Sequence, residues 1–311
     1  MNHPMKIDVP SGATSTFSPL PRAPFRPAAR RFFRPALAIF SLACLAVAAR
    51  AAGSSEGTAI VPKETISLFN GKDLSSFYTW LPKFGHVDPD RVFTVVDNID
   101  GAPAIRSSGQ HYGGIITHAR YANYKLVVEF RWGLVTWAPR HNRARDSGIL
   151  LHCDGEDGNM TKTFSSPWIR SIEYQIIEGG TGDILLLPGY NRGSDVPVAP
   201  RLTIPVLPGK MNVWNPEGKP TEFSKGRLDW QYRDLGWKDV LGFRGAKDVE
   251  KPVGQWNLIE AICDGGDLIY FLNGVKVNEG RNGSFKAGKL LFQSEGAEIF
   301  FRRIELQPLG R

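Results

Sequence analysis

The sequence contains few of the residues that mark disulfide-bonded, zinc-bound or helical proteins. Its 311 residues include 3 cysteines and 6 histidines, and no CxxC or HExxH pattern spaces them as zinc ligands. No P-loop or dinucleotide glycine pattern occurs, and the GxSxG match Gly53-Ser54-Ser55-Glu56-Gly57 lies in a Gly- and Ser-containing spacer rather than at a turn from a strand to a helix, so neither a nucleotide-binding enzyme nor a serine hydrolase is indicated. Beyond residue 51, no apolar pattern of helical period continues past two turns, and no segment reaches the roughly 18 apolar residues that cross a bilayer.

The excess of basic residues over the whole chain is confined to its beginning. The sequence has 38 Lys and Arg against 31 Asp and Glu, but residues 1–51 hold seven of the basic residues and one of the acidic ones. The remainder, with 31 basic and 30 acidic groups, is nearly neutral. A nucleic-acid-binding domain needs a concentrated basic face, so we expect no nucleic-acid partner.

Residues 1–51 have the pattern of an export signal. Basic residues that include Arg30 and Arg31 precede an apolar run over 35–49 and a small-residue cleavage pattern. Paired arginines also occur in twin-arginine signals, so the Sec and the twin-arginine route both stay open. We expect residues 1–51 to be removed and the protein to be periplasmic or extracellular. A lipid anchor at Cys44, which lies in a poor lipobox, and a single membrane anchor are the less favoured alternatives.

After a spacer over 52–63, the sequence predicts one all-β domain over 64–311. Its 33 glycines and 22 prolines favour turns and short strands. Alternating or apolar segments bounded by turn residues predict strands over 66–69, 124–132, 148–153, 171–177, 256–263, 268–272, 289–293 and 298–306. Asn273-Gly274 predicts a type I′ hairpin turn. We expect the Pro- and Gly-rich stretch 188–220 to be a long loop excursion on a sandwich of antiparallel sheets.

Alternation along these strands predicts which side chains share a face of a sheet. Glu173 and Gln175 point to one side of their strand, opposite Tyr174. In the strand predicted over 148–153, His152 is two residues after Leu150, so both side chains should lie on the same face of the sheet. Strands with one apolar and one titratable face predict a polar groove where the sheet curves.

The candidate site residues gather around the strand over 171–177. Glu173 is the candidate general base, because a carboxylate on a rigid strand can be desolvated and poised to take a proton. The other candidates lie on this strand, on its Gly-rich exit or on neighbouring strands: Arg131, Asp146, His152, Gln175, Glu178, Asp183 and Gln293. Each of them also has a structural interpretation, as a solvated strand edge, an ion pair or a core histidine, which the sequence leaves open.

Cysteine and tryptophan leave two further questions open. Cys153 and Cys263 remain after the leader, and they predict either a disulfide in an oxidising compartment or two buried thiols. The 8 tryptophans offer faces that stack on sugar rings, although core packing accounts for such residues equally well.

A series of short motifs recurs in an order that resembles one family. They are Leu68-Phe69-Asn70-Gly71-Lys72-Asp73-Leu74, Asp146-Ser147-Gly148-Ile149, Glu173-Tyr174-Gln175-Ile176, Gly254-Gln255-Trp256-Asn257, Phe271-Leu272-Asn273-Gly274, and Gln293-Ser294-Glu295-Gly296 followed by Phe301-Arg302-Arg303-Ile304. Together they resemble the 3-keto-disaccharide hydrolase family over residues 64–309. The resemblance implies a concanavalin-like jelly roll of two curved antiparallel sheets with a carbohydrate site on one of them. It also implies an exported bacterial protein whose glycoside substrates have been oxidised at C3 by a separate sugar 3-oxidoreductase.

The reaction that the resemblance implies is an elimination followed by hydration. A ketone at C3 acidifies the proton at C2, so a base can take that proton, the C1 substituent can leave, and water can add back. Glu173 would be the base, and the residues that hold the sugar and the enediolate oxygen would be Arg131, His152, Gln175 and Gln293. A divalent metal on the C2 and C3 oxygens would polarise the ketone equally well. Nothing in the spacing of its suitable ligands requires such an ion: Glu173, Glu178, Asp183 and His152.

Two other functions stay open at the level of the sequence. Glu173-x-Gln175-x-x-Glu178 is similar to the E-x-D-x-x-E strand of laminarinase-type retaining glucanases, in which two carboxyls lie about 5–5.5 Å apart. Gln175 replaces the central Asp of that pattern, which weakens this interpretation. A non-catalytic carbohydrate-binding module would need only aromatic faces and hydrogen bonds, whereas a charged Glu173 beside other titratable residues indicates proton transfer.

Overall fold

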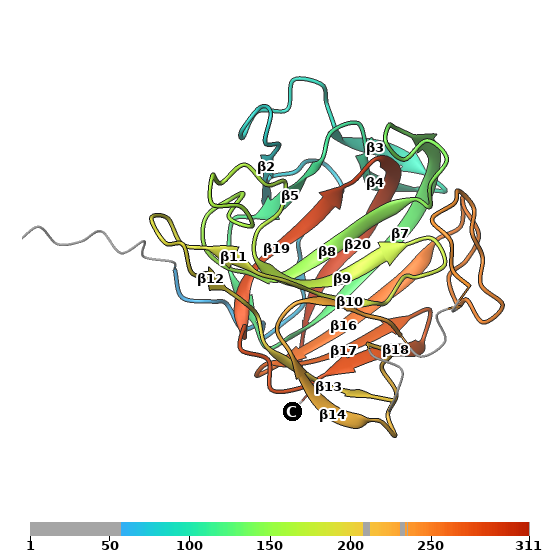
Figure 1. The fold of residues 1–311 in the computed structure, drawn as a ribbon. Helices are drawn as coiled ribbons and strands as arrows, with labels where there is room; N and C mark the ends of the chain where they lie inside the picture. The colour runs from blue at the N-terminus through green and yellow to red at the C-terminus, as the bar shows by residue number, and fades with distance from the viewer. Residues whose placement is uncertain (1–56, 208–211, 231–233, 235, 311) are drawn as a thin grey trace, which may run out of the picture. The chain divides into compact units, whose positions relative to one another are not determined.

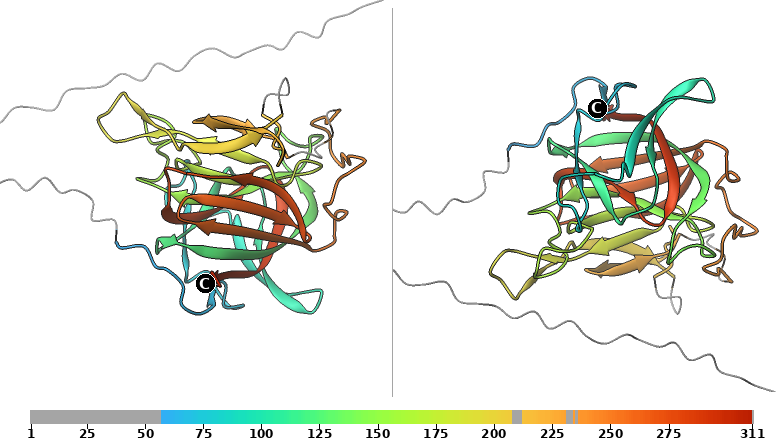
Figure 2. Two further views of the ribbon diagram at one scale, coloured as in Figure 1. Left: turned by 90° about the horizontal axis from the view of Figure 1, so that it is seen from below. Right: turned by 90° about the horizontal axis from the view of Figure 1, so that it is seen from above.

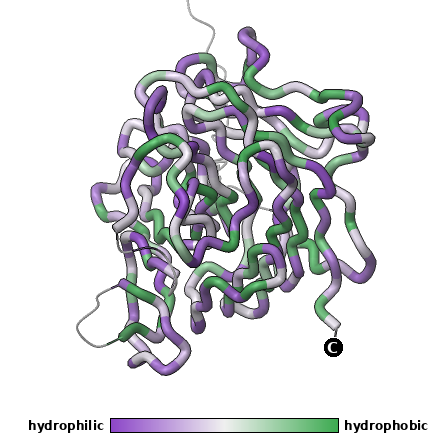
Figure 3. Tube along the Cα trace, turned by 90° about the vertical axis from the view of Figure 1, so that its right-hand side faces the viewer, coloured by the Kyte–Doolittle hydropathy of each residue, from purple (hydrophilic) through white to green (hydrophobic). Residues whose placement is uncertain are grey.

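The period-two alternation of apolar and polar residues gives strands that bury every second side chain. A computed structural model describes residues 57–207, 212–230, 234 and 236–310, and these residues contain strands but no helix. The strand over Asn257–Asp264 alternates buried and half-buried residues along its whole length, as expected for an antiparallel strand with one face on the core. Figure 3 shows the same mixture of hydrophobic and hydrophilic positions along the chain.

The strands follow one another in chain order as β1 (Ile66–Ser67), β2 (Phe77–Trp80), β3 (Phe93–Ile99), β4 (Ala102–Ser107), β5 (Gly113–Thr117), β6 (Tyr121–Ala122), β7 (Tyr124–Thr136), β8 (Asp146–Cys153), β9 (Ser171–Ile177), β10 (Ile184–Leu187), β11 (Gly189–Tyr190), β12 (Pro197–Val198), β13 (Leu202–Val206), β14 (Lys219–Phe223), β15 (Gly226–Leu228), β16 (Asn257–Asp264), β17 (Asp267–Leu272), β18 (Val275–Gly280), β19 (Ala287–Ser294) and β20 (Ala297–Pro308).

Two eight-stranded antiparallel sheets make up most of the fold (Figure 1). The first sheet has the order β18-β17-β16-β7-β20-β4-β3, with β1 beside β20. The second sheet has the order β15-β10-β9-β8-β19-β5-β2, with β6 beside β19. The last two strands of the chain, β19 and β20, therefore lie inside the two sheets between strands from earlier in the sequence. This arrangement is a jelly-roll sandwich, which confirms the predicted all-β fold.

The two sheets bury one common core between them (Figure 2). Ile149, Tyr174 and Phe292 of the second sheet belong to the same buried cluster as Phe130 and Tyr270 of the first. The rings of Tyr174 and Tyr270 stack across the interface with their centroids 4.4 Å apart. Since these side chains of the second sheet point inward, their neighbours in the alternation point outward. We call the outward side of the second sheet the site face.

The predicted hairpin is confirmed, but the stretch 188–220 is more ordered than a loop excursion. Asn273 and Gly274 have φ values of 51° and 81°, as a type I′ turn between β17 and β18 requires. Within 188–220, β11 pairs with β12, and β13 pairs with β14, whose last residues lie just beyond that stretch. β13 alternates in burial because Leu202 and Ile204 pack into the core cluster. The high proline and glycine content concealed these short strands.

Cys153 and Cys263 are both free and buried, so no disulfide joins them. The export-signal prediction over 1–51, the lipid-anchor alternative at Cys44 and residues 52–56 of the predicted spacer lie outside the described residues. Within the described ranges, no helix has the length and apolar character needed to cross a membrane.

Candidate functional site

Strands β8, β9 and β19 place a group of polar side chains on the site face. β8 pairs with β9 so that Gly148 lies opposite Gln175, and β19 runs along the other edge of β8. The apolar neighbours on these strands belong to the core, so Glu173, Gln175 and Gln293 point to the site face. Their exposed fractions are only 3%, 2% and 1%, respectively. The site therefore has a floor of polar side chains that are almost completely removed from water.

Gly148 leaves the space in which Glu173 and Gln293 meet. A Cβ atom at this position would lie 2.3 Å from Glu173 Oε1 and 2.5 Å from Gln293 Oε1. Ordinary van der Waals contacts of a Cβ begin at 3.4 Å, so any larger residue must displace both side chains. The Gln293 side chain also acts on the Glu173 carboxyl group electrostatically, because it lowers the pKa of that group. Close approach of two side chains is thus the reason for glycine in the Asp146-Ser147-Gly148 motif.

The surroundings of Glu173 raise its pKa to about 8. Burial is the largest cause and the Asp146 carboxylate adds repulsion, while Arg227 and the Gln293 side chain act in the opposite direction. Burial also raises the pKa of Asp146 to about 6, against the attraction of Arg140 and Arg227. A carboxylate with a pKa near neutrality is suited to remove a proton from carbon, because it is basic enough and is still ionised in part.

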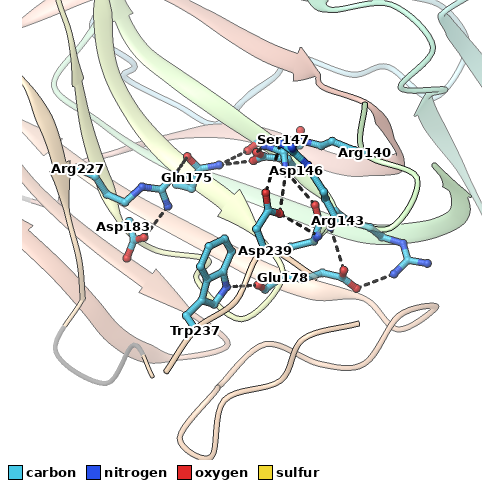
Figure 4. A network of polar contacts seen from close by, with 12 residues as sticks. Arg140, Arg143, Asp146, Ser147, Gln175, Glu178, Asp183, Arg227, Trp237 and Asp239 are labelled. Atoms are coloured by element: carbon cyan, nitrogen blue, oxygen red, sulfur yellow. Dashed lines mark hydrogen bonds and ion pairs between the residues drawn. The ribbon is translucent and has the colours of Figure 1, made fainter. Parts of the chain in front are cut away.

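Asp146, Gln175 and Arg227 form a chain of hydrogen bonds across the site face (Figure 4). Gln175 Nε2 donates to Asp146 Oδ1 over 2.5 Å and to the Ser147 carbonyl oxygen over 3.0 Å. Gln175 Oε1 accepts from Arg227 Nη2 at 3.1 Å, and Arg227 Nη1 donates to Asp183 Oδ2 at 2.9 Å. These bonds fix the orientation of the Gln175 amide and hold the Arg227 guanidinium at the edge of the polar floor.

Arg140 pairs with Asp146 from the other side and connects it to a later loop. Arg140 Nη2 bonds Asp146 Oδ2, and Arg140 Nη1 lies 3.3 Å from Asp239 Oδ1. The same Asp239 oxygen accepts a hydrogen bond of 3.1 Å from the Ala144 backbone N–H. The loop around Asp239 and the loop before β8 are thus joined beside the polar floor, as Figure 4 shows.

Part-exposed side chains surround the buried floor. Tyr112 stacks on Trp168, with ring centroids 6.3 Å apart and planes at 30°, and the Arg140 guanidinium lowers the pKa of its hydroxyl against the effect of burial. Glu295 lies in the turn after β19, where burial and the two neighbouring carboxylates hold its pKa well above the usual range. Glu295, a half-buried carboxyl group whose pKa is raised, and the aromatic pair thus lie on the border of the polar floor, an arrangement that can hold a sugar ring and supply a proton. We call Asp146, Glu173 and Glu295 the acid cluster.

The structure brings together most of the predicted site residues. Asp146, Glu173, Gln175 and Gln293 lie side by side, and Asp183 joins them through Arg227. The residues of the site that the sequence analysis missed include Arg140, Arg227 and Glu295. Glu295 belongs to the Gln293-Ser294-Glu295-Gly296 motif, which offered a signal, whereas no pattern indicated either arginine.

The prediction that His152 faces the site is wrong. His152 Nδ1 bonds the Phe285 carbonyl oxygen at 2.9 Å, and its ring packs edge-on against Tyr124 of the core. A bulge where β8 pairs with β19, at which His152 has a φ of 54°, breaks the alternation after Leu150. Cys153 consequently takes the site side. Burial lowers the pKa of His152 to about 4, so the imidazole is neutral.

The predictions for Arg131 and Glu178 also need correction. Arg131 lies on β7 of the first sheet and pairs with Asp100, its Nη1 lying 2.6 Å from Oδ2, so it cannot serve as the oxygen clamp of the site face. Glu178 is held by Arg145, whose Nη1 lies 2.6 Å from Oε1 and whose backbone N–H donates to Oε2 over 2.9 Å. Its carboxylate is therefore committed to an ion pair.

The residues considered as metal ligands do not fit a divalent cation. Across the part of the chain that the structure describes, no group of three or more His, Cys, Asp or Glu side chains converges as a metal site would require. The Asp183 oxygens are bonded to Arg227 and to the Trp230 backbone N–H. Glu178 is bound by arginine and His152 lies in the core, so their oxygen and nitrogen atoms are not presented together.

The fold is a jelly roll with carboxylates on the outward face of one sheet. Glycosidases and carbohydrate-binding modules are among the proteins that have this kind of fold. The chain belongs to the family of 3-keto-alpha-glucoside-1,2-lyase-like domains, whose model matches residues 64–307. This match confirms the resemblance that the ordered motifs indicate.

Several solved structures are similar to the chain. A candidate glycosyl hydrolase from Parabacteroides distasonis is 20% identical, with a TM-score of 0.43 over 79% of this chain and 94% of that one. A beta-glucanase from Bacillus licheniformis is 9% identical, with a TM-score of 0.37 over 80% and 99% of the two chains. A carbohydrate-binding module from Bacillus subtilis is 10% identical, with a TM-score of 0.35 over 68% and 91%. These are likenesses of fold, and no curated protein matches the chain.

Proposed function

We propose that this protein cleaves glycosides whose C3 hydroxyl has been oxidised to a ketone. The observation that carries the proposal is the Glu173 carboxylate, which has a pKa raised to about 8 and meets Gln293 over Gly148. The description of the family refers to a 3-keto-α-glucoside, which supports the same class of substrate. The part-exposed Tyr112 and Trp168 beside the acid cluster suit a sugar ring.

The proposed chemistry begins at C2 of the oxidised sugar. Ionised Glu173 takes the C2 proton, and the electron pair of the C–H bond moves into an enediolate with its charge on the C3 oxygen. When the C3 carbonyl forms again, the pair moves between C1 and C2, the C1–O bond breaks, and the leaving oxygen takes a proton. Water then adds its hydroxyl to C1 and a proton to C2, which yields a free 3-keto sugar.

The side chains around Glu173 divide the remaining tasks. Gln293 and Arg227, which both act on the Glu173 charge, are the proposed hydrogen-bond donors to the C3 oxygen of the enediolate. Glu295 is the proposed donor of the proton to the leaving oxygen, because its raised pKa favours the protonated form. Gln175 holds Arg227 in place through a hydrogen bond, and Asp146 in turn holds the Gln175 amide.

Replacing Glu173 by Gln tests the base. The wild-type protein is incubated with α- and β-linked 3-keto-glucosides, with and without a chelator, while the ultraviolet absorbance of the enone intermediate is followed. We expect turnover by the wild type and a loss of about 10² to 10⁴ in kcat for Glu173→Gln, the usual contribution of a positioned acid–base group. Circular dichroism checks that the variant is folded.

Glu250→Gln is the matched control for this experiment. Glu250 is also 3% exposed, and burial likewise raises its pKa to about 8. Its oxygens accept from Trp132 Nε1 at 2.7 Å and Thr181 Oγ1 at 2.9 Å, so it is occupied away from the site face. We expect Glu250→Gln to keep wild-type turnover. If Glu173→Gln turns over substrate as fast as this control, Glu173 is not the base.

A carbohydrate-binding module is the second candidate function, and the stacked Tyr112 and Trp168 favour it. Binding of a 3-keto-glucoside without turnover, with the same affinity in wild type and Glu173→Gln, would support this alternative. The retaining-glucanase alternative loses its second carboxylate, because Arg145 holds Glu178. Cleavage of an unoxidised glucan by the purified protein would restore it.

The proposed reaction also places the protein between two other reactions. A separate sugar 3-oxidoreductase must supply the ketone at C3, and a reaction that consumes 3-keto sugars must remove the product. Export to the periplasm or beyond stays a prediction from residues 1–51.

A further inference from the structure

A second group of polar and aromatic side chains lies on the site face, away from the acid cluster. Lys289 precedes Gln293 by four residues on β19, so these residues of equal parity are about 13 Å apart. Between them Leu291, with Leu150 on the adjacent strand, is fully buried in an apolar cluster against which Trp168 packs. This apolar bridge separates the surroundings of Lys289 from Glu173 and its neighbours.

Lys289 lies between two adjoining clefts. One has a volume of about 480 Å³, and its lining includes His118 and Arg120. The other has a volume of about 350 Å³, and its lining includes Tyr78 and Trp80. Lys289 lines both, so the two clefts meet at its side chain.

A chain of hydrogen bonds runs along the second cleft. Lys289 Nζ donates to the Tyr78 hydroxyl over 3.1 Å and lies 4.7 Å from the centre of its ring. The Tyr78 hydroxyl donates to Asp157 Oδ1 over 2.8 Å, and Asp157 Oδ2 lies 2.9 Å from His86 Nε2. Burial raises the pKa of Tyr78 far above its usual value, so the phenol remains a donor. The ring of Trp80 lies 5.5 Å from that of His86 and completes an aromatic wall.

The lining of the first cleft includes two cationic side chains, Arg120 and Lys289, together with the His118 ring and no carboxylate. Arg120 is paired with Asp154 at 3.8 Å, so the Lys289 ammonium is the group on which anion binding in this cleft depends. Lys289 is bonded to a neutral phenol rather than to an acid. The cleft therefore offers cationic hydrogen-bond donors to an anion.

We infer that the double cleft is a second binding site, which takes a saccharide that carries a negatively charged group. The sugar ring packs against Trp80 and the Tyr78–His86 wall, and the anionic group binds Lys289, with His118 and Arg120 beside it. A uronic acid and a sugar phosphate share this chemistry. The site is independent of the proposed cleavage at Glu173, and it would hold the protein on acidic glycans or glycosides.

The test measures binding to the full protein by calorimetry, with D-glucuronate, glucose 6-phosphate, D-glucose and inorganic phosphate as the probes. We expect at least one anionic sugar to bind ten or more times as tightly as glucose and as phosphate, and to weaken as ionic strength rises. Lys289→Met should abolish this preference and Lys289→Arg should keep it. Lys125→Met is the control, because Lys125 pairs with Glu260 on the first sheet.

Several results would overturn the inference. Equal affinity for glucose and both anionic sugars would show that the cleft does not select charge, and equal affinity for phosphate would show that it does not select the ring. Unchanged binding in folded Lys289→Met would place the anion elsewhere. Glu173→Gln should leave the binding of the anionic sugar intact, and Lys289→Met should leave turnover of a 3-keto-glucoside intact. The two sites can therefore fail separately.

Discussion

Gly148→Ala is the sharpest perturbation of the acid cluster, because one methyl group enters the space between Glu173 and Gln293. The added Cβ would lie 2.3 Å from Glu173 Oε1, where ordinary contact begins at 3.4 Å. The carboxylate must therefore move by about 1 Å, and a misplacement of that size in a catalytic group costs on the order of 10²-fold in rate. The φ of Gly148 is not in the left-handed region, so alanine adds a contact without straining the backbone.

We expect Gly148→Ala to lower kcat/KM for a 3-keto-glucoside about 100-fold. The assay follows release of 3-keto-glucose at several substrate concentrations, together with thermal unfolding of the variant. Gly133→Ala is the matched control, since its Cβ would lie 2.2 Å from Glu298 Oε2 but on β7 of the first sheet. Wild-type kcat/KM in folded Gly148→Ala, or equal losses in both variants, would refute the assignment of Glu173 to the reacting position.

Two further predictions use the raised pKa values. Ionisation of Glu173 should set the ascending limb of the pH profile, so kcat/KM should rise as the pH approaches about 8, and a level profile from about pH 6 to 9 would contradict this role. Glu250 has a folded-state pKa of about 8 against an ordinary 4.5, so the folded protein binds its proton more tightly than the unfolded chain does. As the pH rises from about 4.5 to about 8, the free energy of unfolding should thus fall, and Glu250 should contribute up to about 1.4 kcal/mol per pH unit to this decrease. Glu250→Gln should remove that loss, so its stability relative to wild type should be greater at pH 8 than at pH 5 in urea unfolding, and equal differences at both values would count against the assignment.

The strands and the central residues of the site follow from local patterns in the sequence. Alternation in β9 and β19 placed Glu173, Gln175 and Gln293 opposite apolar core residues, and the structure has them so. Asn273-Gly274 predicted its hairpin because few residue pairs accept two positive φ values. Such features depend on near neighbours in the chain, which is why the sequence alone reveals them.

The errors arose where distant segments decide the outcome. Alternation tells which residues share a face but not which sheet a strand joins, and for this reason it could not exclude Arg131, which lies on the first sheet, from the candidate site. A bulge opposite β19 reversed the face of His152, and nothing in its own segment indicates that bulge. Arg140 bonds Asp146 from a loop, and Arg227 bonds Gln175 and Asp183 from an edge strand. Only the assembled sheet brings those guanidinium groups to the carboxylates.

The interior position of β19 and β20 has a consequence for biosynthesis. Until the residues beyond 287 have left the ribosome, β19 is missing between β5 and β8. In the same way, β20 is missing between β4 and β7. The nascent chain then carries four open edges that invite pairing with other chains. We therefore expect a chain that ends shortly before Ala287 to aggregate through these edges rather than to form a shortened, folded protein.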